Sequence, residues 1–265
     1  MEESNPFSFI DVFAGIGGMR KAFEAVGGQC VFSCEWDKFA QKTYRANFDC
    51  DHEMAGDVTQ VDVRDMPKHD LLLAGFPCQP FSISSVAKYN ALGREHGFKH
   101  DTQGTLFFDL ARIIEHHRPK AFLLENVPNL ANHDQGRTFS TILRVLTEEL
   151  GYHVSHRVLS AEFFVPQKRK RIFIVGFREP NGFTLGNLSL PANNVPRLGS
   201  ILHPEDGSEE PNLPTPMKTA VSWRNTRFRI ACGFSCKPVR KETLRNPVNS
   251  SLTIRYWIET MLPTH

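Results

Sequence analysis

Short apolar runs alternate with amphipathic stretches along the first two thirds of the chain. Apolar runs bounded by polar residues or glycine predict strands, and apolar residues spaced three and four apart predict helices. Strands that alternate with helices are typical of an α/β fold with a doubly wound, mostly parallel, Rossmann-like sheet. The expected strands cover residues 9–13, 29–35, 71–74, 121–124, 153–159 and 172–177, and the expected helices cover residues 19–26, 38–48, 106–116 and 139–150.

The pattern changes after Phe177. Residues 180–216 contain seven of the 17 prolines and four glycines, which indicates a boundary between structural units. Beyond it, residues 218–265 show little apolar periodicity. We therefore expect a main domain over residues 1–178, a Pro/Gly-rich linker or the start of a small lobe over 179–217, and an irregular basic segment over 218–265.

Composition narrows the class of protein. The chain has 265 residues, of which 40% are hydrophobic and 23% charged, close to the average for a soluble globular protein. It has no apolar run long enough to span a membrane, and its first residues are acidic, unlike a signal peptide. The six cysteines are too few and too scattered for a disulfide framework, so we predict thiols, no metal site and a cytoplasmic protein.

Charge is distributed unevenly although the net charge is only +2. Residues 218–245 hold eight Lys and Arg residues against one acid, Glu242. Such a run is either a solvated face or a surface that neutralises phosphates, and composition favours neither interpretation.

The first motif is the glycine-rich stretch FIDVFAGIGG at residues 9–18, where a strand leads through a glycine turn into a helix. Glycines let the backbone approach a nucleotide-like ligand, although the same pattern also serves a simple tight connection. The sequence Glu-Trp-Asp at 35–37 ends the next expected strand, where a carboxylate can bind ribose hydroxyls and an aromatic ring can cover adenine. No Walker-type lysine is present, so an adenosyl ligand without a pyrophosphate fits better than an NTP.

Three further motifs lie at expected strand ends. Cys78 stands in GFPCQPF at residues 75–81, a position where it is either a nucleophile or an inert small hydrophobe. Glu125 in LLENV is either a general acid or a helix cap. In PQKRKRI at 166–172, Arg169 and Arg171 are expected to point the same way from a strand, unless this is only a solvated edge.

Together, in this order and at these spacings, the motifs closely resemble those of the cytosine-5 DNA methyltransferase family. The resemblance runs from about Phe9 to Phe177 and includes the segment GTLFFD at residues 104–109. The long insertion at 84–101 is similar to the extended loop of the Dcm-type bacterial subgroup. The resemblance implies an enzyme that transfers a methyl group from S-adenosyl-L-methionine to C5 of a cytosine flipped out of duplex DNA.

The same resemblance implies a role for individual residues. Cys78 matches the nucleophile that attacks C6, and Glu125 matches the acid that binds or protonates N3. Arg169 is expected to contact the base and Arg171 to support the site. The residues that match the cofactor pocket are Phe13, Gly15, Glu35, Trp36, Asp57 and Pro77.

The chain departs from the family pattern after the core motifs, because the closing Arg-rich and Gly-Asn-Ser-Val motifs are absent. An apolar stripe on the first helix, formed by Met19, Ala22, Phe23 and Val26, is then expected to lack its usual cover. We therefore also weigh a truncated or split enzyme that is inactive without a second polypeptide supplying the missing motifs. The motifs leave open an RNA cytosine methyltransferase too and, more remotely, a different Rossmann enzyme such as a dehydrogenase. The favoured setting is a bacterial restriction-modification system or an orphan methylase.

Overall fold

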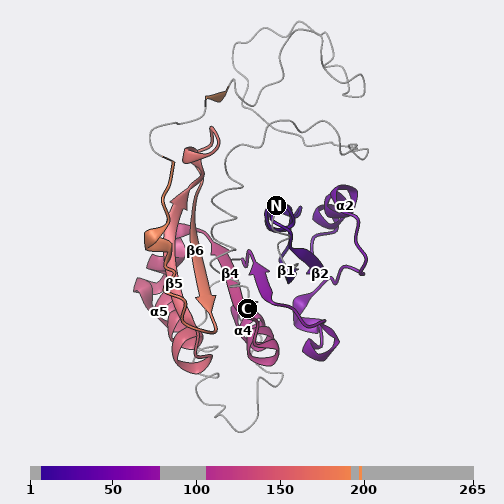
Figure 1. Ribbon diagram of the computed structural model, residues 1–265, viewed down its shortest axis with the longest axis horizontal. Coiled ribbons are helices and arrows are strands. Elements are labelled where there is room, and N and C mark those ends of the chain that lie inside the picture. Colours follow the sequence, from indigo (N-terminus) through magenta and orange to yellow (C-terminus); the bar gives the residue numbers. More distant parts are fainter. Residues whose placement is uncertain (1–6, 78–105, 192–196, 199–265) are drawn as a thin grey trace, which may run out of the picture.

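Six strands form one sheet in the order β2-β1-β3-β4-β6-β5 (Figure 1). The computed structural model describes residues 7–77, 106–191 and 197–198. The strands are β1 (Ser8–Val12), β2 (Gln29–Cys34), β3 (Leu71–Ala74), β4 (Ala121–Asn126), β5 (His153–Ser160) and β6 (Lys170–Phe177). The strand pairs from β2 to β4 are parallel, whereas β6 runs antiparallel to both β4 and β5.

The strands lie close to the positions that the apolar runs predict. All four residues of β3 are buried, as expected for a parallel strand covered on both faces. Both β4 and β6 extend two residues further at the site edge than expected, and this extension places Glu125 in register opposite Phe173. The expected α/β fold with a mostly parallel sheet is confirmed.

Helices cover both faces of the sheet. The α-helices are α1 (Gly18–Glu24), α2 (Lys38–Asn47), α4 (Leu106–His117) and α5 (Arg137–Arg144). The expected helix over residues 139–150 is α-helical only as far as Arg144 and continues as a π-helical turn at Val145–Glu149. At the start of α2, the side chain of Asp37 accepts a hydrogen bond from the Ala40 N–H and caps the helix.

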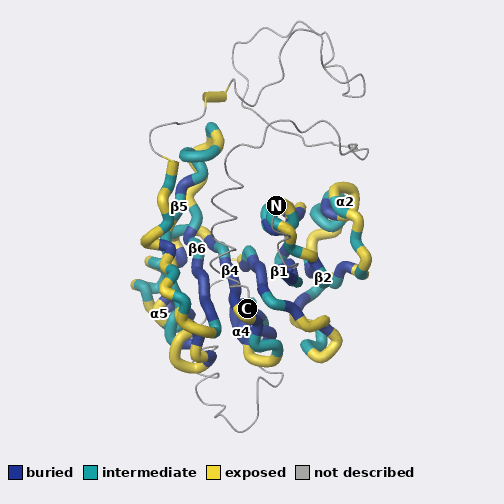
Figure 2. Tube along the Cα trace, in the orientation of Figure 1, coloured by how far each residue is buried: buried dark blue, intermediate teal, exposed yellow. Residues whose placement is uncertain are grey.

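The core consists of two main clusters, one on each face. Alternate residues along each strand point to opposite faces, so Ile10, Leu72 and Phe122 pack with α4 and α5, while Phe9 and Leu73 pack with α1. Buried residues follow the strands and the inner sides of the helices (Figure 2). Within the described ranges, no helix has both the length and the hydropathy of a membrane span.

The apolar stripe on α1 is largely covered in this fold. Phe23 is buried, and Met19 and Ala22 are half-buried against the same cluster, as is Val26, which follows α1 because the helix ends at Glu24 and not at residue 26 as expected. The exposed apolar area on this helix is therefore smaller in the structure than the sequence predicts. The segment 218–265, and residues 192–196 and 199–217 of the expected linker, lie outside the described residues.

Candidate active site

One edge of the sheet gathers the sequence-predicted residues. Because β1 to β4 are parallel and β6 is antiparallel to β4, the carboxyl ends of the first four strands meet the amino end of β6. Ligand sites in open α/β sheets lie at this edge. Residues there come from the loops after β1, β2 and β3, from β4 itself and from the start of β6.

The glycine turn after β1 has an unusual backbone. Phe13 has φ +56°, a left-handed conformation that is strained for a bulky residue, and Gly15 and Gly17 have φ +56° and +89°. The Ala14 N–H donates to the Cys34 carbonyl at 3.0 Å, which ties the turn to the end of β2. The turn therefore lies against the strand that carries Glu35.

Glu35 connects this turn to α2. Its Oε2 accepts a hydrogen bond from the Gly15 N–H at 2.7 Å, and its Oε1 accepts one from the Asp37 N–H at 2.8 Å. Each carboxylate oxygen has further acceptor capacity, so Glu35 can also accept hydrogen bonds from ligand hydroxyls. Next to it the Trp36 side chain is 73% exposed, and Ile16 in the turn is 61% exposed. A carboxylate beside exposed apolar groups fits the ribose and base of an adenosyl ligand.

Asp57 lies beside the same strand end. Two residues before it, Ala55 pairs with the end of β2. The Ala55 N–H donates to the Ser33 carbonyl, and the Glu35 N–H donates to the Ala55 carbonyl, both at 2.9 Å. Asp57 then caps a short 3-10 turn, η1 (Val58–Gln60), through its Oδ1. The structure thus brings Glu35 and Asp57 to neighbouring positions.

Glu125 and Arg171 form a half-buried ion pair across β4 and β6. Glu125 Oε1 lies 2.8 Å from Arg171 Nε, and both side chains are about one-fifth exposed, at 21% and 22%. The other oxygen, Oε2, faces Gly75, where an added Cβ would lie 3.5 Å from it and 3.9 Å from the Phe13 carbonyl oxygen. The glycine turn, the loop after β3 and the carboxylate of Glu125 therefore converge on Gly75.

Arg169 lies directly before strand β6. Strand β6 begins at Lys170, so Lys168 and Arg169 precede it, and Arg169 is exposed. The Ala161 N–H donates to the Arg169 carbonyl at 2.8 Å, which places Arg169 in the turn between β5 and β6. The basic run therefore begins before β6 and continues into it, and the expectation that Arg169 and Arg171 point the same way stays a prediction.

The loop after β3 is anchored by a residue that sequence reasoning missed. Asn126 is buried on β4, and its Nδ2 donates to the Phe76 carbonyl at 2.9 Å. This bond fixes the backbone directly before Pro77, which is exposed. Cys78 is the next residue in the chain and lies outside the described residues, so its predicted role stays a prediction.

Comparison with known proteins decides the family. The family model for C-5 cytosine-specific DNA methylase matches residues 7–227. The chain belongs to the C-5 cytosine-specific DNA methylase family. It is 47% identical over 232 residues to the DNA-cytosine methyltransferase of Escherichia coli K12, covering 75% of this chain and 49% of that protein. It is 46% identical over 234 residues to the type II methyltransferase M.HpaII of Haemophilus parainfluenzae, covering 84% of this chain and 60% of that protein.

Solved structures of this methylase fold agree with the architecture. The structure of the Schizosaccharomyces pombe Dnmt2 methyltransferase matches with a TM-score of 0.54 at 16% identity, over 75% of this chain and 60% of that chain. The Entamoeba histolytica methyltransferase EhMeth matches with a TM-score of 0.51 at 18% identity, over 76% and 61%. The chain spans about half of the E. coli relative and about three fifths of M.HpaII.

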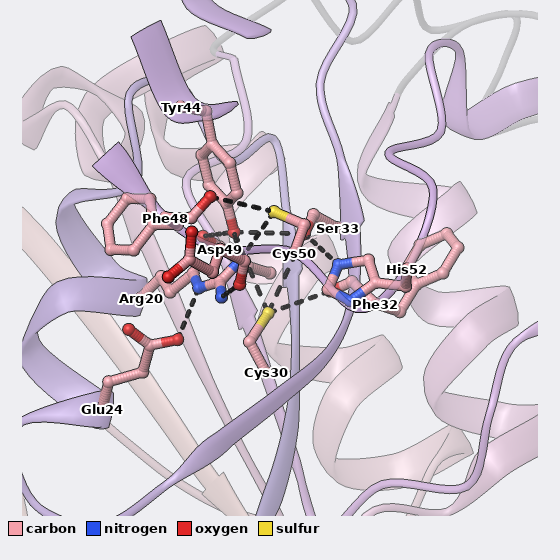
Figure 3. Close-up of polar contacts among 11 residues, drawn as sticks. Arg20, Glu24, Cys30, Phe32, Ser33, Tyr44, Phe48, Asp49, Cys50 and His52 are labelled. Atoms are coloured by element: carbon pink, nitrogen blue, oxygen red, sulfur yellow. Dashed lines mark hydrogen bonds and ion pairs between the residues drawn. The ribbon is translucent and has the colours of Figure 1, made fainter. Parts of the chain in front are cut away.

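Behind the glycine turn of this methylase domain lies a buried polar cluster (Figure 3). Arg20 on α1 donates to Glu24 Oε1 at 2.6 Å, to the Asp49 carbonyl at 3.0 Å and to Cys50 Sγ at 3.1 Å. Its guanidinium lies 4.7 Å from the centroid of the Phe48 ring, a cation–π contact. The cluster therefore joins α1 to the segment that follows α2.

The same cluster continues to the strands through Tyr44. The Tyr44 hydroxyl lies 3.1 Å from Ser33 Oγ on β2 and 3.4 Å from Asp11 Oδ2 on β1. Asp11 is buried, and desolvation raises the pKa of its carboxyl to about 8. These bonds tie β1, β2 and α2 together beneath the glycine turn, a set of long-range contacts that the sequence does not signal.

The described cysteines outside the candidate site are structural. Cys30 and Cys34 are buried free thiols, as predicted. Burial raises the pKa of Cys30 to about 11 and that of Cys34 to about 12, so both stay protonated near neutral pH. Among the described residues, His, Cys, Asp and Glu form no cluster of three or more that could hold a metal ion.

Proposed function

We propose that this chain carries the catalytic core of a DNA (cytosine-5)-methyltransferase. The reaction transfers a methyl group from S-adenosyl-L-methionine to C5 of a cytosine flipped out of duplex DNA. The observation that carries the proposal is the convergence at Gly75 of the glycine turn, the Glu125 carboxylate and the loop that leads into Cys78. Membership of the methylase family supports the same conclusion.

The cofactor fits the residues at the ends of β1 and β2. Glu35 is already oriented by backbone N–H groups and can accept hydrogen bonds from two ribose hydroxyls. Trp36 offers an exposed aromatic face for the adenine, and Phe13, Gly15, Asp57 and Pro77 line the same edge in the proposal. When bound, S-adenosyl-L-methionine supplies an electrophilic methyl group.

Cytosine needs activation before it accepts that methyl group, because C5 is a poor nucleophile. In the proposed mechanism the Cys78 thiolate adds to C6 and forms a C–S bond, which moves electron density to C5. Glu125 holds or protonates N3 and so stabilises the charge that develops in the ring. After methyl transfer a base removes the C5 proton, and the thiolate leaves as the C5–C6 double bond re-forms.

The two arginines have different proposed roles. Arg171 pairs with Glu125 Oε1, which leaves Oε2 to face the reacting base. Arg169, exposed in the turn before β6, contacts the flipped base and its covalent adduct. The basic segment 218–245 neutralises DNA phosphates in this proposal. The setting is a restriction-modification system or an orphan methylase in a bacterial cytoplasm.

Covalent trapping tests the proposal. Duplex DNA that contains 5-fluorocytosine has no C5 proton to lose, so the adduct with Cys78 cannot collapse. In the presence of S-adenosyl-L-methionine the chain should form a stable protein–DNA complex on a denaturing gel, and Cys78→Ala should abolish it. Cys50→Ala removes a thiol of the polar cluster and serves as the matched control, which should still trap.

Each outcome of the trapping experiment has a meaning. Trapping by Cys78→Ala would contradict the assignment of the nucleophile. Cofactor binding without trapping would contradict activity of this chain alone and favour a split enzyme that a second polypeptide completes. Methyl transfer to tRNA and not to DNA, measured in parallel with tritiated cofactor, would favour an RNA cytosine methyltransferase.

A further inference from the structure

The segment that carries Asp57 is held at its first end by β2. Ala55 forms a parallel bridge with Cys34, and the Cys34 thiol donates to the Gly56 carbonyl at 3.4 Å. Asp57 follows two residues after Ala55, whose carbonyl accepts a hydrogen bond from the Glu35 N–H. The bonds of the turn that follows Asp57 hold its carboxylate.

Asp57 uses one of its two carboxylate oxygens within its own turn. Oδ1 accepts hydrogen bonds from the Thr59 N–H at 3.0 Å and from the Thr59 hydroxyl at 2.8 Å. Among the described residues, Oδ2 has no hydrogen-bond partner, so it remains an acceptor for a ligand. The turn itself is short: η1 spans three residues and is closed by Gln60 N–H to Asp57 carbonyl and Val61 N–H to Val58 carbonyl bonds of 3.0 and 3.3 Å.

A side chain from α4 holds the second end of this turn. Arg112 Nη1 donates to the Val61 carbonyl at 3.0 Å, and Arg112 Nη2 donates to the Val58 carbonyl at 3.2 Å. The two carbonyls belong to the first residue of η1 and to the residue that follows η1, and the planar guanidinium reaches both at once. Arg112 is 54 residues away from Val58 in the sequence, so no local pattern reveals the contact.

Asp109 fixes the orientation of that guanidinium. Its Oδ1 lies 3.4 Å from Arg112 Nη2, one turn away on α4, and the two side chains are 22% and 21% exposed. Burial raises the pKa of Asp109, and the nearby charge of Asp57 raises it further, while Arg112 lowers it. Arg112 is thus the cation shared by a half-buried carboxylate and the backbone at η1.

We propose that Arg112 is a positioning residue for cofactor binding, which it serves by clamping η1 so that Asp57 Oδ2 stays beside Glu35. The inference rests on the proposed cofactor site. Arg112 does not touch the cofactor and acts only through Asp57. The role explains why α4 carries the charged pair of Asp109 and Arg112 close to η1.

Substitution of Arg112 should weaken the cofactor without slowing the chemistry. In the full chain, Arg112→Ala should raise the Kd for S-adenosylhomocysteine about tenfold, the change that corresponds to one lost charged hydrogen-bond set. The Kd of Arg112→Lys should lie between those of the wild type and Arg112→Ala, because an ammonium cannot span both carbonyls. The KM for S-adenosyl-L-methionine should rise with kcat unchanged, since none of the proposed reacting groups, Cys78, Glu125 and Arg169, belongs to η1 or α4.

Arg64→Ala provides the matched control. Arg64 lies in the same loop and pairs with Asp62 in solvent, with its own side chain 77% exposed. Its removal takes away one positive charge, as Arg112→Ala does, but leaves the bonds to η1 intact, so cofactor binding should be unchanged. An equal loss of affinity in both variants would show a general charge effect and overturn the inference.

A double-mutant cycle with Asp57→Ala separates positioning from general structural damage. If Arg112 acts through Asp57, its substitution should add nothing to the Kd of the Asp57→Ala variant. Additive losses would overturn the inference. Amide hydrogen exchange of the ligand-free protein adds a second readout: residues 59–61 should exchange faster in Arg112→Ala while the strands keep their protection.

The experiments distinguish a failure of the proposed cofactor site from a failure of the role of Arg112. A wild-type chain that does not bind S-adenosylhomocysteine would overturn the cofactor site and the inference with it. A wild-type chain that binds, together with an Arg112→Ala variant that binds equally well, would overturn the inference alone.

Discussion

Three glycines between β1 and the start of α1 should respond differently to substitution by alanine. Gly17 has φ +89°, and an added Cβ would lie 2.1 Å from Phe48 Cε2. Gly15 has φ +56° with nothing within 4 Å of the added Cβ. Gly18 begins α1 with ordinary φ and open space. The series therefore separates backbone strain from steric overlap.

The structure sets the size of each effect. The left-handed conformation costs a non-glycine residue about 1–2 kcal/mol, which is the whole expected destabilisation of Gly15→Ala. Gly17→Ala adds overpacking against the Phe48 ring, about 1–3 kcal/mol more, for a total of about 2–5 kcal/mol. Gly18→Ala should stabilise by about 0.4–1 kcal/mol, because alanine is the better helix residue and restricts the unfolded chain.

Urea unfolding of the ligand-free chain, followed by circular dichroism, measures these differences as shifts in midpoint at constant slope. The order of stability should be Gly18→Ala, wild type, Gly15→Ala, Gly17→Ala. In a Phe48→Ala background the extra cost of Gly17→Ala over Gly15→Ala should disappear. A Gly17→Ala variant as stable as Gly15→Ala, or an extra cost that persists without the Phe48 ring, would refute the packing of this turn.

Three more predictions concern the site and the core. Glu35→Ala should raise the Kd for S-adenosylhomocysteine about ten- to a hundredfold through the loss of a charged acceptor, whereas an unchanged Kd by calorimetry would contradict its role. Asn126→Ala leaves the Phe76 carbonyl without its donor, so trapping on 5-fluorocytosine DNA should slow while cofactor affinity stays similar; equal trapping rates would exclude this anchor. Burial lowers the pKa of His69 to about 4, so the folded state resists its protonation, and unfolding free energy should fall as the pH drops from 6.5 to 4, by on the order of 3 kcal/mol. His69→Gln should flatten that pH dependence, and an unaltered slope would show that other groups cause it.

The strands were predictable because buried parallel strands leave continuous apolar runs. Strand β3 matches its expected range of residues 71–74, β1 is shifted by one residue toward the N-terminus, and β2 ends one residue early. The polar ends were harder to predict. Glu125 and Asn126 belong to β4 because they pair with β6, and Lys170 and Arg171 belong to β6 because they pair with β5, so pairing continues past the apolar residues in both cases. Pairing of this kind depends on the partner strand and leaves no local signal.

The sequence indicates which residues belong to the candidate site but not which contacts they make. The sequence indicates Glu35, Glu125 and Arg171, since each lies at the end of an apolar run or in a basic one. The bond from Gly15 to Glu35, the Glu125–Arg171 pair and the Arg112 clamp each join residues that are 20 or more positions apart. Such contacts follow only from the strand order, which brings these segments to one edge.

Methylation in a host without cytosine methylases tests the central claim most directly. The full chain and Cys78→Ala are expressed in parallel, and the host DNA is sequenced after bisulfite conversion, which reports both activity and sequence context. We predict 5-methylcytosine at a defined sequence in the DNA from cells with the wild-type chain and none in the DNA from cells with Cys78→Ala. Complete conversion of the DNA from both strains, with both proteins folded and present at equal levels, would contradict the account.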